Sequence, residues 1–213
     1  MCVIKIISHR GYWKSIEEKN SKVAFERSFS QGFGIETDIR DYRGKIVISH
    51  NIANEKCVDL DYFYKLYKRF DDSLLLAIDI KADGLQKKLK ELILKNEIRN
   101  YFVFDMSIPD AMAYINEGLN AFTRQSEYET EPSFYKYANG IVIDGFFTDW
   151  VKEKDINNHL KNGKKVCLIS PELHDRPHKL FWKKLTAMNV LENDELIICT
   201  DFPKEAKRFF YGR

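Results

Sequence analysis

Histidine and acidic side chains end the first four apolar segments of the chain. These side chains are His9, Glu36, Asp38, His50 and Asp79. Because residues two apart on a strand point to the same face, Glu36 and Asp38 can act on one site. Carboxylates and imidazoles gathered at strand ends are the components of a metal-assisted acid–base site.

A shared cation follows from the three carboxylates. Two like charges about 4 Å apart repel by roughly 4 kcal/mol at an effective dielectric constant near 20, so three acids at one place require a compensating ion. Ligation by oxygen alone favours Mg²⁺ or Ca²⁺ over zinc. We therefore expect Glu36, Asp38 and Asp79 to hold a divalent cation.

Two histidines beside such a cation suit an in-line displacement at phosphorus. One imidazole removes a proton from the nucleophile and the other protonates the leaving oxygen, and each transfer typically contributes about 10²- to 10⁴-fold in rate. Arg10 and Lys81 are placed to stabilise charge on the phosphoryl oxygens. No GxSxG nucleophile elbow is present, so a phosphodiester is a better candidate substrate than a carboxylic ester.

The elements that position these residues alternate between strands and helices. Apolar runs of strand length cover residues 3–8, 33–40, 45–49, 74–80, 101–106, 121–124, 140–143, 165–169 and 195–199. Most are separated by segments with helical spacing, which predicts βα units and a parallel sheet. Run 45–49 follows its predecessor too closely for a crossover helix and is expected to form a short antiparallel ribbon. Eight strands remain, which predicts an α/β fold of the (β/α)8 TIM-barrel type, as a single domain over residues 1–213, with residues 202–211 as its last helix.

Composition narrows the class of protein. The chain has 34 basic and 32 acidic residues, for a net charge of +2, which gives no reason to expect nucleic acid or an anionic membrane as a partner. No apolar run approaches the roughly 20 residues that span a bilayer, and no signal peptide opens the chain. The four cysteines form no CxxC pair and are expected to be reduced packing residues. We expect a cytoplasmic protein without stable membrane insertion.

The motifs together resemble a known family, the glycerophosphodiester phosphodiesterases of the PLC-like phosphodiesterase superfamily. The matching residues are His9-Arg10-Gly11, Asn20 with Ala24-Phe25, Gly32, Glu36-x-Asp38, His50, Asp79-x-Lys81 and Thr200-Asp201-x-Pro203. They span nearly the whole chain. The HRG opening followed by ExD and a later histidine is a highly specific combination.

The resemblance implies a TIM barrel, a divalent cation held by the three acids, acid–base roles for His9 and His50, and phosphate contacts from Arg10 and Lys81. It implies a metal-dependent hydrolase of lipid metabolism. Such an enzyme cleaves a glycerophosphodiester, or a related small polar phosphodiester, to an alcohol and a phosphomonoester. The family does not fix the oligomeric state.

Three departures from the family pattern leave alternatives open. Asn51 follows His50 where the family usually has aspartate, Lys19 stands where it commonly has glutamate, and Asp79 replaces a more frequent glutamate. The Asp-x-Lys form is similar to the sphingomyelinase D branch, whose transesterification yields a cyclic phosphate. A barrel that binds ligand without catalysis is the other alternative. The short segment after His50 indicates that the family's inserted subdomain is missing.

Polar residues also follow the later strands. Arg124, Glu127, Glu172 and His174 are candidates to recognise the non-phosphate part of the substrate, because residues at these strand ends face the same edge of a barrel. His159 and His178 fall in expected helices and are predicted to be surface residues.

Overall fold

The computed structural model describes residues 4–212, and their backbone contacts divide into two compact units. The N-terminal unit comprises residues 8–121, and the C-terminal unit combines residues 4–7 with 122–212. Strand β1 (Lys5–His9) runs from one unit into the other. The expectation that residues 1–213 form one domain stays a prediction.

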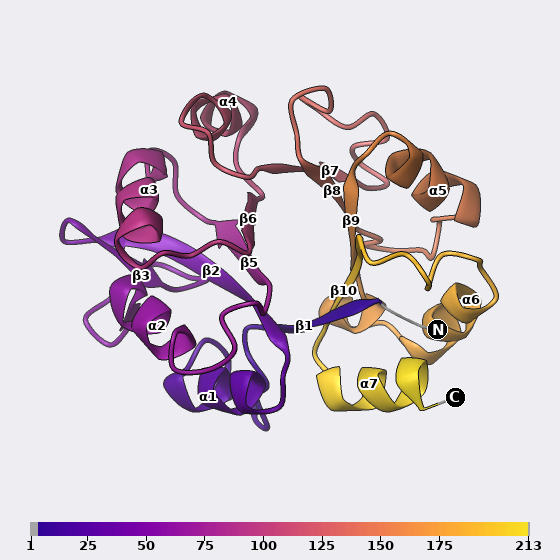
Figure 1. The fold of residues 1–213 in the computed structure, drawn as a ribbon, viewed down its shortest axis with the longest axis horizontal. Coiled ribbons are helices and arrows are strands. Elements are labelled where there is room, and N and C mark those ends of the chain that lie inside the picture. Colours follow the sequence, from indigo (N-terminus) through magenta and orange to yellow (C-terminus); the bar gives the residue numbers. More distant parts are fainter. Residues whose placement is uncertain (1–3, 213) are drawn as a thin grey trace. The chain divides into compact units, whose positions relative to one another are not determined.

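The N-terminal unit contains a mixed sheet (Figure 1). Strands β2 (Gly34–Tyr42), β5 (Leu76–Ile80) and β6 (Tyr101–Phe104) are parallel, in that order. Strand β3 (Lys45–Ile48) pairs antiparallel with β2, and the short β4 (Val58–Asp59) pairs with β3. The expected ribbon at 45–49 is therefore confirmed.

The helices of this unit pack their apolar faces on the sheet and on one another. They are α1 (Lys22–Ser30), α2 (Leu60–Tyr67), α3 (Gln86–Lys95) and α4 (Ile108–Asn116), with a 3₁₀ turn η1 (Ile16–Glu18). Helices α1 and α2 lie side by side (Figure 1), and the rings of Phe25 and Phe63 meet edge to face at 4.8 Å. Phe25 and Phe63 are fully buried, so these aromatic contacts fix the helices behind the strands that carry the acids.

The C-terminal unit has a parallel sheet whose order follows the sequence. Its strands are β7 (Phe122–Gln125), β8 (Gly140–Ile143), β9 (Lys165–Ile169) and β10 (Leu196–Thr200). Its helices are α5 (Glu153–Lys161), α6 (Lys179–Thr186) and α7 (Pro203–Tyr211), with a 3₁₀ turn η2 (Pro171–His174). The alternation of parallel strands with helices agrees with the sequence prediction in both units, and α7 is the predicted last helix.

Some side chains differ from their predicted environment. His159 is 9% exposed, because its ring bonds to Tyr135 and Gln125, so its assignment to the surface was wrong. Cys167 and Cys199 are buried within strands, as expected, whereas Cys2 lies outside the described residues. Among residues 4–212, every helix is too short or too polar to cross a bilayer.

Candidate metal and acid–base site

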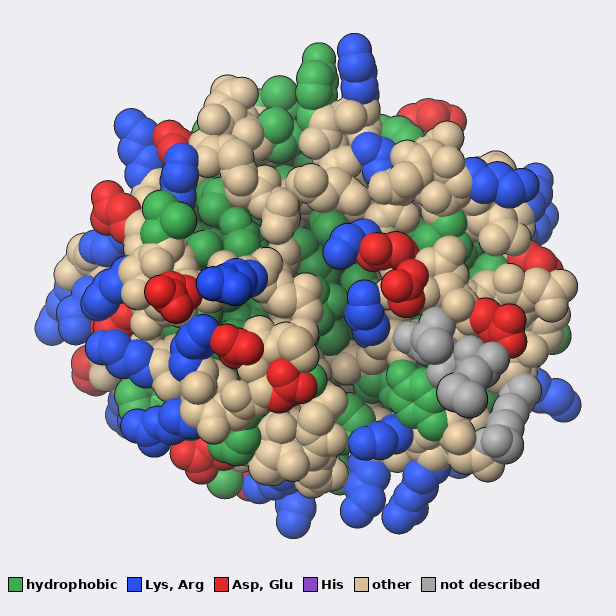
Figure 2. Space-filling model, viewed as in Figure 1, with side chains coloured by type: hydrophobic (Ala, Val, Ile, Leu, Met, Phe, Trp, Pro, Cys, Tyr) green, Lys and Arg blue, Asp and Glu red, His purple; other side chains and the backbone are tan. Residues whose placement is uncertain are grey.

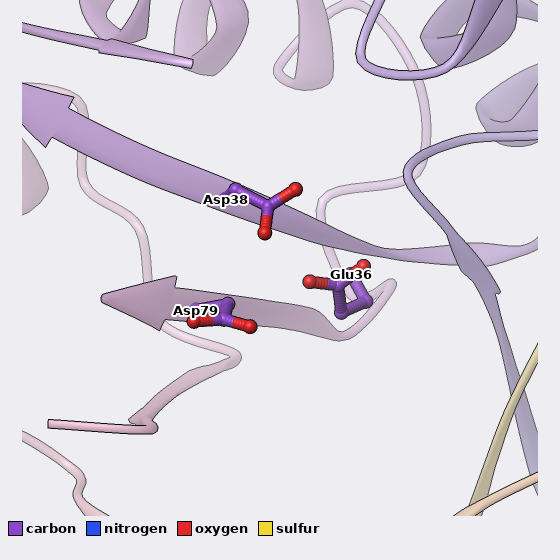
Figure 3. Close-up of side chains that lie close together, drawn as sticks. All are labelled: Glu36, Asp38 and Asp79. Carbon is purple, nitrogen blue, oxygen red and sulfur yellow. The ribbon is translucent and has the colours of Figure 1, made fainter. Parts of the chain in front are cut away.

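Three buried carboxylates converge in the N-terminal unit. Glu36 and Asp38 extend from β2 and Asp79 from β5, with exposed fractions of 3%, 0% and 6%. The parallel register sets Asp38 beside Asp79, and the two-residue spacing keeps Glu36 on the same face. One oxygen from each lies within 4.8 Å of the others, and Figure 3 shows the carboxylates directed into a common space.

Burial and mutual repulsion make these acids hard to ionise by themselves. Loss of solvation raises the pKa of Glu36 well above its usual range, and the charges of Asp38 and Asp79 raise it further. Burial likewise raises the pKa of Asp79, with Asp105 as the next cause. A bound cation would remove both penalties, because it favours the ionised form of each ligand.

The donor set fits a hard divalent ion. Asp38 Oδ1 and Asp79 Oδ1 are buried and accept no hydrogen bond from the described residues, so each presents an unshared oxygen to the common space. All three candidate ligands are carboxylates, which is the chemistry that Mg²⁺ and Ca²⁺ prefer. The structure therefore supports a site that could hold a divalent ion, as the sequence predicted, without distinguishing which ion.

Arg10 and Asn20 contact the two acids that β2 contributes to the site. The backbone nitrogen of Arg10 donates to Glu36 Oε2 at 3.1 Å, and its Nε lies 3.0 Å from Asp38 Oδ2. Arg10 has a positive φ of 58°, which turns the chain at the end of β1 so that its backbone and side chain both face these acids. The Asn20 side-chain amide donates to Asp38 Oδ2 at 2.7 Å. Arg10 and Asn20 thus fix the carboxylate of Asp38 in place.

Lys81 contacts the acids from the end of β5, together with Asp105, which the sequence analysis did not identify as a site residue. Lys81 Nζ lies 2.6 Å from Asp79 Oδ2, 3.9 Å from Asp38 Oδ1 and 3.5 Å from Asp105 Oδ2. Although burial opposes its charge, the neighbouring carboxylates, Asp79 foremost, raise the pKa of Lys81. Asp105 directly follows β6 with a φ of 67°, and the sequence analysis had included it in an apolar run. The signal that could have identified Asp105 is its position, because it is an acid at the end of β6, the strand that pairs in parallel with β5.

The charges around the site are unbalanced by two. Four carboxylates (Glu36, Asp38, Asp79 and Asp105) face two cationic side chains (Arg10 and Lys81), which leaves a formal charge of −2 when all four acids are ionised and both histidines are neutral. One divalent cation would cancel that charge. The charge balance therefore points to the same ion as the geometry.

The two histidines occupy different environments. His9 is 8% exposed, and its Nε2 lies 3.9 Å from Glu36 Oε2, directly beside the acids. His50 is exposed and lines an open groove with Arg10 and Asn20. Its Nδ1 lies 3.1 Å from Asn51 Oδ1, so a proton on Nδ1 would bond to Asn51 and leave Nε2 as a base. Asn51 can thus orient the ring of His50.

The four candidate substrate residues lie in the C-terminal unit. Arg124 pairs with Glu129 at 2.6 Å, and His174 Nε2 lies 2.6 Å from Asp144 Oδ1, a hydrogen bond that raises the pKa of His174. Burial opposes ionisation of Glu127, but hydrogen bonds from backbone amides outweigh it and lower its pKa to about 2.

The fourth of these residues, Glu172, is held by internal hydrogen bonds. It accepts from the hydroxyls of Ser170 and Thr200 and from the backbone nitrogen of Asp201. Its carboxylate is therefore engaged within the protein. The substrate-recognition role of all four residues stays a prediction.

Comparison with known proteins identifies structures that share this fold. No family model matches the sequence, and no curated protein matches it either. Solved structures do match. One is a protein from Galdieria sulphuraria that is proposed to be a glycerophosphodiester phosphodiesterase (TM-score 0.78, 17% identity, covering 99% of this chain and 98% of that one). Another is glycerophosphodiester phosphodiesterase from Agrobacterium tumefaciens (TM-score 0.72, 16% identity, 99% and 100% covered).

The similarity extends to other enzymes of the same architecture. Phosphoribosyl anthranilate isomerase from Thermus thermophilus matches with a TM-score of 0.55 and 10% identity, over 98% of this chain and 97% of that one. The fold of this chain is therefore the α/β fold of TIM-barrel proteins, as predicted. Glycerophosphodiester phosphodiesterase structures match it with TM-scores of 0.68–0.78 across nearly its full length.

Proposed function

We propose that the protein is a metal-dependent phosphodiesterase that hydrolyses a glycerophosphodiester, or a related small polar phosphodiester, to an alcohol and a phosphomonoester. The observation that carries this proposal is the cluster of Glu36, Asp38 and Asp79, buried within 4.8 Å of one another. Cationic side chains and a histidine adjoin it, which is the set that phosphoryl transfer requires. The fold supports the proposal, because several structures of this enzyme class share it.

The residues of the site would divide the work as follows. The three acids would hold a divalent ion, which when bound stabilises negative charge on phosphoryl oxygens. Arg10 and Lys81 would bind the non-bridging oxygens through charge-assisted hydrogen bonds. One histidine would take the proton of the attacking water as its oxygen bonds to phosphorus, and the other would protonate the alkoxide as the second P–O bond breaks. His9 and His50 are assigned these two proton transfers.

The test identifies the phosphorus-containing product of the reaction. Purified protein in Mg²⁺ or Ca²⁺ is expected to release glycerol 3-phosphate from a glycerophosphodiester, and a chelator should abolish this release until the ion is restored. We expect His9→Ala and Glu36→Gln to lower kcat/KM by about 10²-fold or more. Glu91→Gln, on the exposed face of α3, is the matched control and should retain wild-type activity.

The same experiment separates the alternatives. A cyclic phosphate seen by phosphorus NMR would replace hydrolysis by transesterification, the alternative that the Asp-x-Lys form of residues 79–81 suggests. Metal binding without turnover of any diester would refute catalysis and leave a binding protein.

A further inference from the structure

Strand β2 carries a third charged side chain at the spacing of its two acids. Glu36, Asp38 and Arg40 are two residues apart, and side chains at that spacing point to the same face of a strand. The antiparallel register pairs Arg40 with Val47 of β3, so that the loop after β3 returns toward the acids. Arg40 is partly buried and lies between the acids and that loop.

The hydrogen bond that Arg40 makes goes to the backbone of His50. Its Nε donates to the His50 carbonyl oxygen at 3.2 Å. Within residues 4–212, the two terminal nitrogens of its guanidinium make no hydrogen bond or ion pair. Because the donors of a guanidinium lie in one rigid plane, the bond from Nε fixes the direction in which the His50 carbonyl points.

Hydrogen bonds, and not packing, fix the orientation of His50, because its side chain is exposed. On one side, the backbone N–H of Ser49 donates to the Asp38 carbonyl at 3.0 Å, and the Ser49 hydroxyl donates to the Asn51 carbonyl at 2.8 Å. On the other, His50 Nδ1 lies 3.1 Å from Asn51 Oδ1. The peptide group that joins His50 to Asn51 is planar, and its carbonyl is the group that Arg40 binds. Rotation of that peptide group would separate the imidazole from the Asn51 side chain.

We propose that Arg40 is a positioning residue for the phosphodiesterase reaction. By fixing the peptide group between His50 and Asn51, it keeps the imidazole of His50 in the orientation that proton transfer requires. Arg40 acts through His50 and not by contact with the substrate. This proposal rests on the proposed function, in which His50 carries out one of the two proton transfers.

Two substitutions separate the hydrogen bond of Arg40 from its charge. Glutamine Nε2 and arginine Nε are the same number of bonds from Cα, so Arg40→Gln keeps a donor at this position and loses the charge. Arg40→Met is of similar length and has no donor. With glycerophosphoglycerol and Mg²⁺, we expect Arg40→Met to lower kcat about tenfold, a part of the roughly 10²- to 10⁴-fold that one acid–base group supplies, with little change in KM. Arg40→Gln should stay within about threefold of wild-type kcat, because a neutral amide still donates.

The control for these variants is Arg43→Met. Arg43 is exposed in the turn between β2 and β3, with its guanidinium over the ring of Tyr42, so its loss should leave kcat unchanged. Equal losses of kcat in Arg40→Gln and Arg40→Met would show that the charge matters and the hydrogen bond does not. A rise in KM with kcat unchanged would show that Arg40 binds the substrate. Either result would overturn the proposal.

A double-mutant cycle tests whether Arg40 acts through His50. His50→Ala removes the imidazole that Arg40 orients, so adding Arg40→Met to it should lower kcat no further than about twofold. A merely structural role, or a contact with the substrate, would instead give a second loss of about tenfold, because independent effects are multiplied in the double variant. That second loss would contradict a positioning role.

NMR of the histidine ring nitrogens gives a readout that needs no turnover. The chain has five histidines, and the signals of His50 are those lost in His50→Ala. A neutral His50 ring that bonds to Asn51 Oδ1 carries its proton on Nδ1. Arg40→Met should shift the His50 nitrogens toward a mixture of the two tautomers, while Arg40→Gln and Arg43→Met should keep the wild-type signals. Unchanged His50 signals in Arg40→Met, or a mixture already present in the wild type, would overturn the proposal.

The two kinds of measurement distinguish failure of the positioning role from failure of the proposed function. Turnover of glycerophosphoglycerol that is unaffected by Arg40→Met refutes the positioning role and leaves the phosphodiesterase proposal intact. If no diester is hydrolysed, the proposed function is refuted, and the NMR comparison still decides whether Arg40 orients His50.

Discussion

At the scale of single residues, the site is a balance of buried charges. Three of its acids are nearly inaccessible to water, and Arg10 and Lys81 compensate them in part. Leaving buried charges uncompensated is costly, so this group of acids could hold an additional cation. Asp105 contributes to this pattern, because it draws Lys81 toward itself while Asp79 contacts the same ammonium group.

We predict that Asp105→Asn weakens divalent-ion binding about tenfold, which corresponds to ~1.4 kcal/mol. Two effects act in the same direction. The substitution removes one negative charge near the ligands, and it leaves the positive charge of Lys81 shared among fewer carboxylates, so that Lys81 competes more strongly with the ion for Asp79. Titration calorimetry with Mg²⁺ or Ca²⁺ measures the change.

The control for this prediction is Asp83→Asn. Asp83 is exposed and accepts a hydrogen bond from Ser107, so its loss should alter the affinity little. If Asp105→Asn also bound the ion with wild-type affinity, the charge of Asp105 would have no part in ion binding.

At the scale of elements, the turn after β1 brings the backbone close to α1. Gly11 has a φ of +84°, and a Cβ there would lie 2.9 Å from Ala24 Cβ. The next residue, Tyr12, donates its backbone N–H to the Ala24 carbonyl at 3.1 Å. Only glycine permits both the positive φ and the close approach. The packing of α1 thereby fixes the segment that begins with His9 and Arg10.

We predict that Gly11→Ala lowers the free energy of unfolding by about 2 kcal/mol or more. A left-handed conformation costs a non-glycine residue roughly 1–2 kcal/mol, and overpacking against Ala24 adds to it. Gly32→Ala is the comparison, because Gly32 has a φ of +74° but no atom within 4 Å of the added Cβ. Gly32→Ala should lower the free energy of unfolding only by the cost of the left-handed backbone conformation. Urea denaturation measures both, and equal losses would contradict a role for the Ala24 contact.

The sequence predicted elements better than it predicted contacts. The apolar runs located the longer strands of both units and the β2–β3 ribbon, because strand burial leaves a periodic signal. The two-residue strand β4 is too short to show a period. Similarly, the spacing of Glu36 and Asp38 predicted a common face, while their convergence with Asp79 depends on inter-strand register. Register and the pairing of Lys81 with Asp105 arise from tertiary packing, which a linear pattern does not encode.

At the scale of the whole molecule, the candidate chemistry is concentrated in one part of the chain. The acids, both histidines, Arg10 and Lys81 all belong to residues 8–121, whereas the predicted substrate residues belong to the C-terminal unit. Acidic and basic side chains are interspersed over the face drawn in Figure 2, in keeping with the small net charge of +2. The strongest charge imbalance lies instead at the buried acids Glu36, Asp38 and Asp79. The stability of the protein should therefore depend on the ionisation of these acids.

We predict that unfolding responds to both pH and divalent ions. The folded-state pKa values of Glu36 and Asp79 are raised, so the folded protein binds more protons than the unfolded chain above the ordinary carboxyl range. In chelator, these two acids should therefore contribute a loss of stability as pH rises from about 4.5 toward neutrality. With an ion bound, the acids are ionised at lower pH, and this loss should largely disappear.

Thermal unfolding measured with and without the ion tests this expectation. An ion at about 100 times its dissociation constant stabilises by about 2.7 kcal/mol, or roughly 5–10 °C for a chain of this length. Glu36→Gln should change both unfolding temperatures. Without the ion it should unfold at a higher temperature than the wild type, because one buried charge that repels Asp38 and Asp79 is gone. It should also lose most of the stabilisation by the ion. A variant that was less stable in chelator, yet equally stabilised by Mg²⁺ or Ca²⁺, would show that Glu36 neither repels its neighbours nor binds the cation.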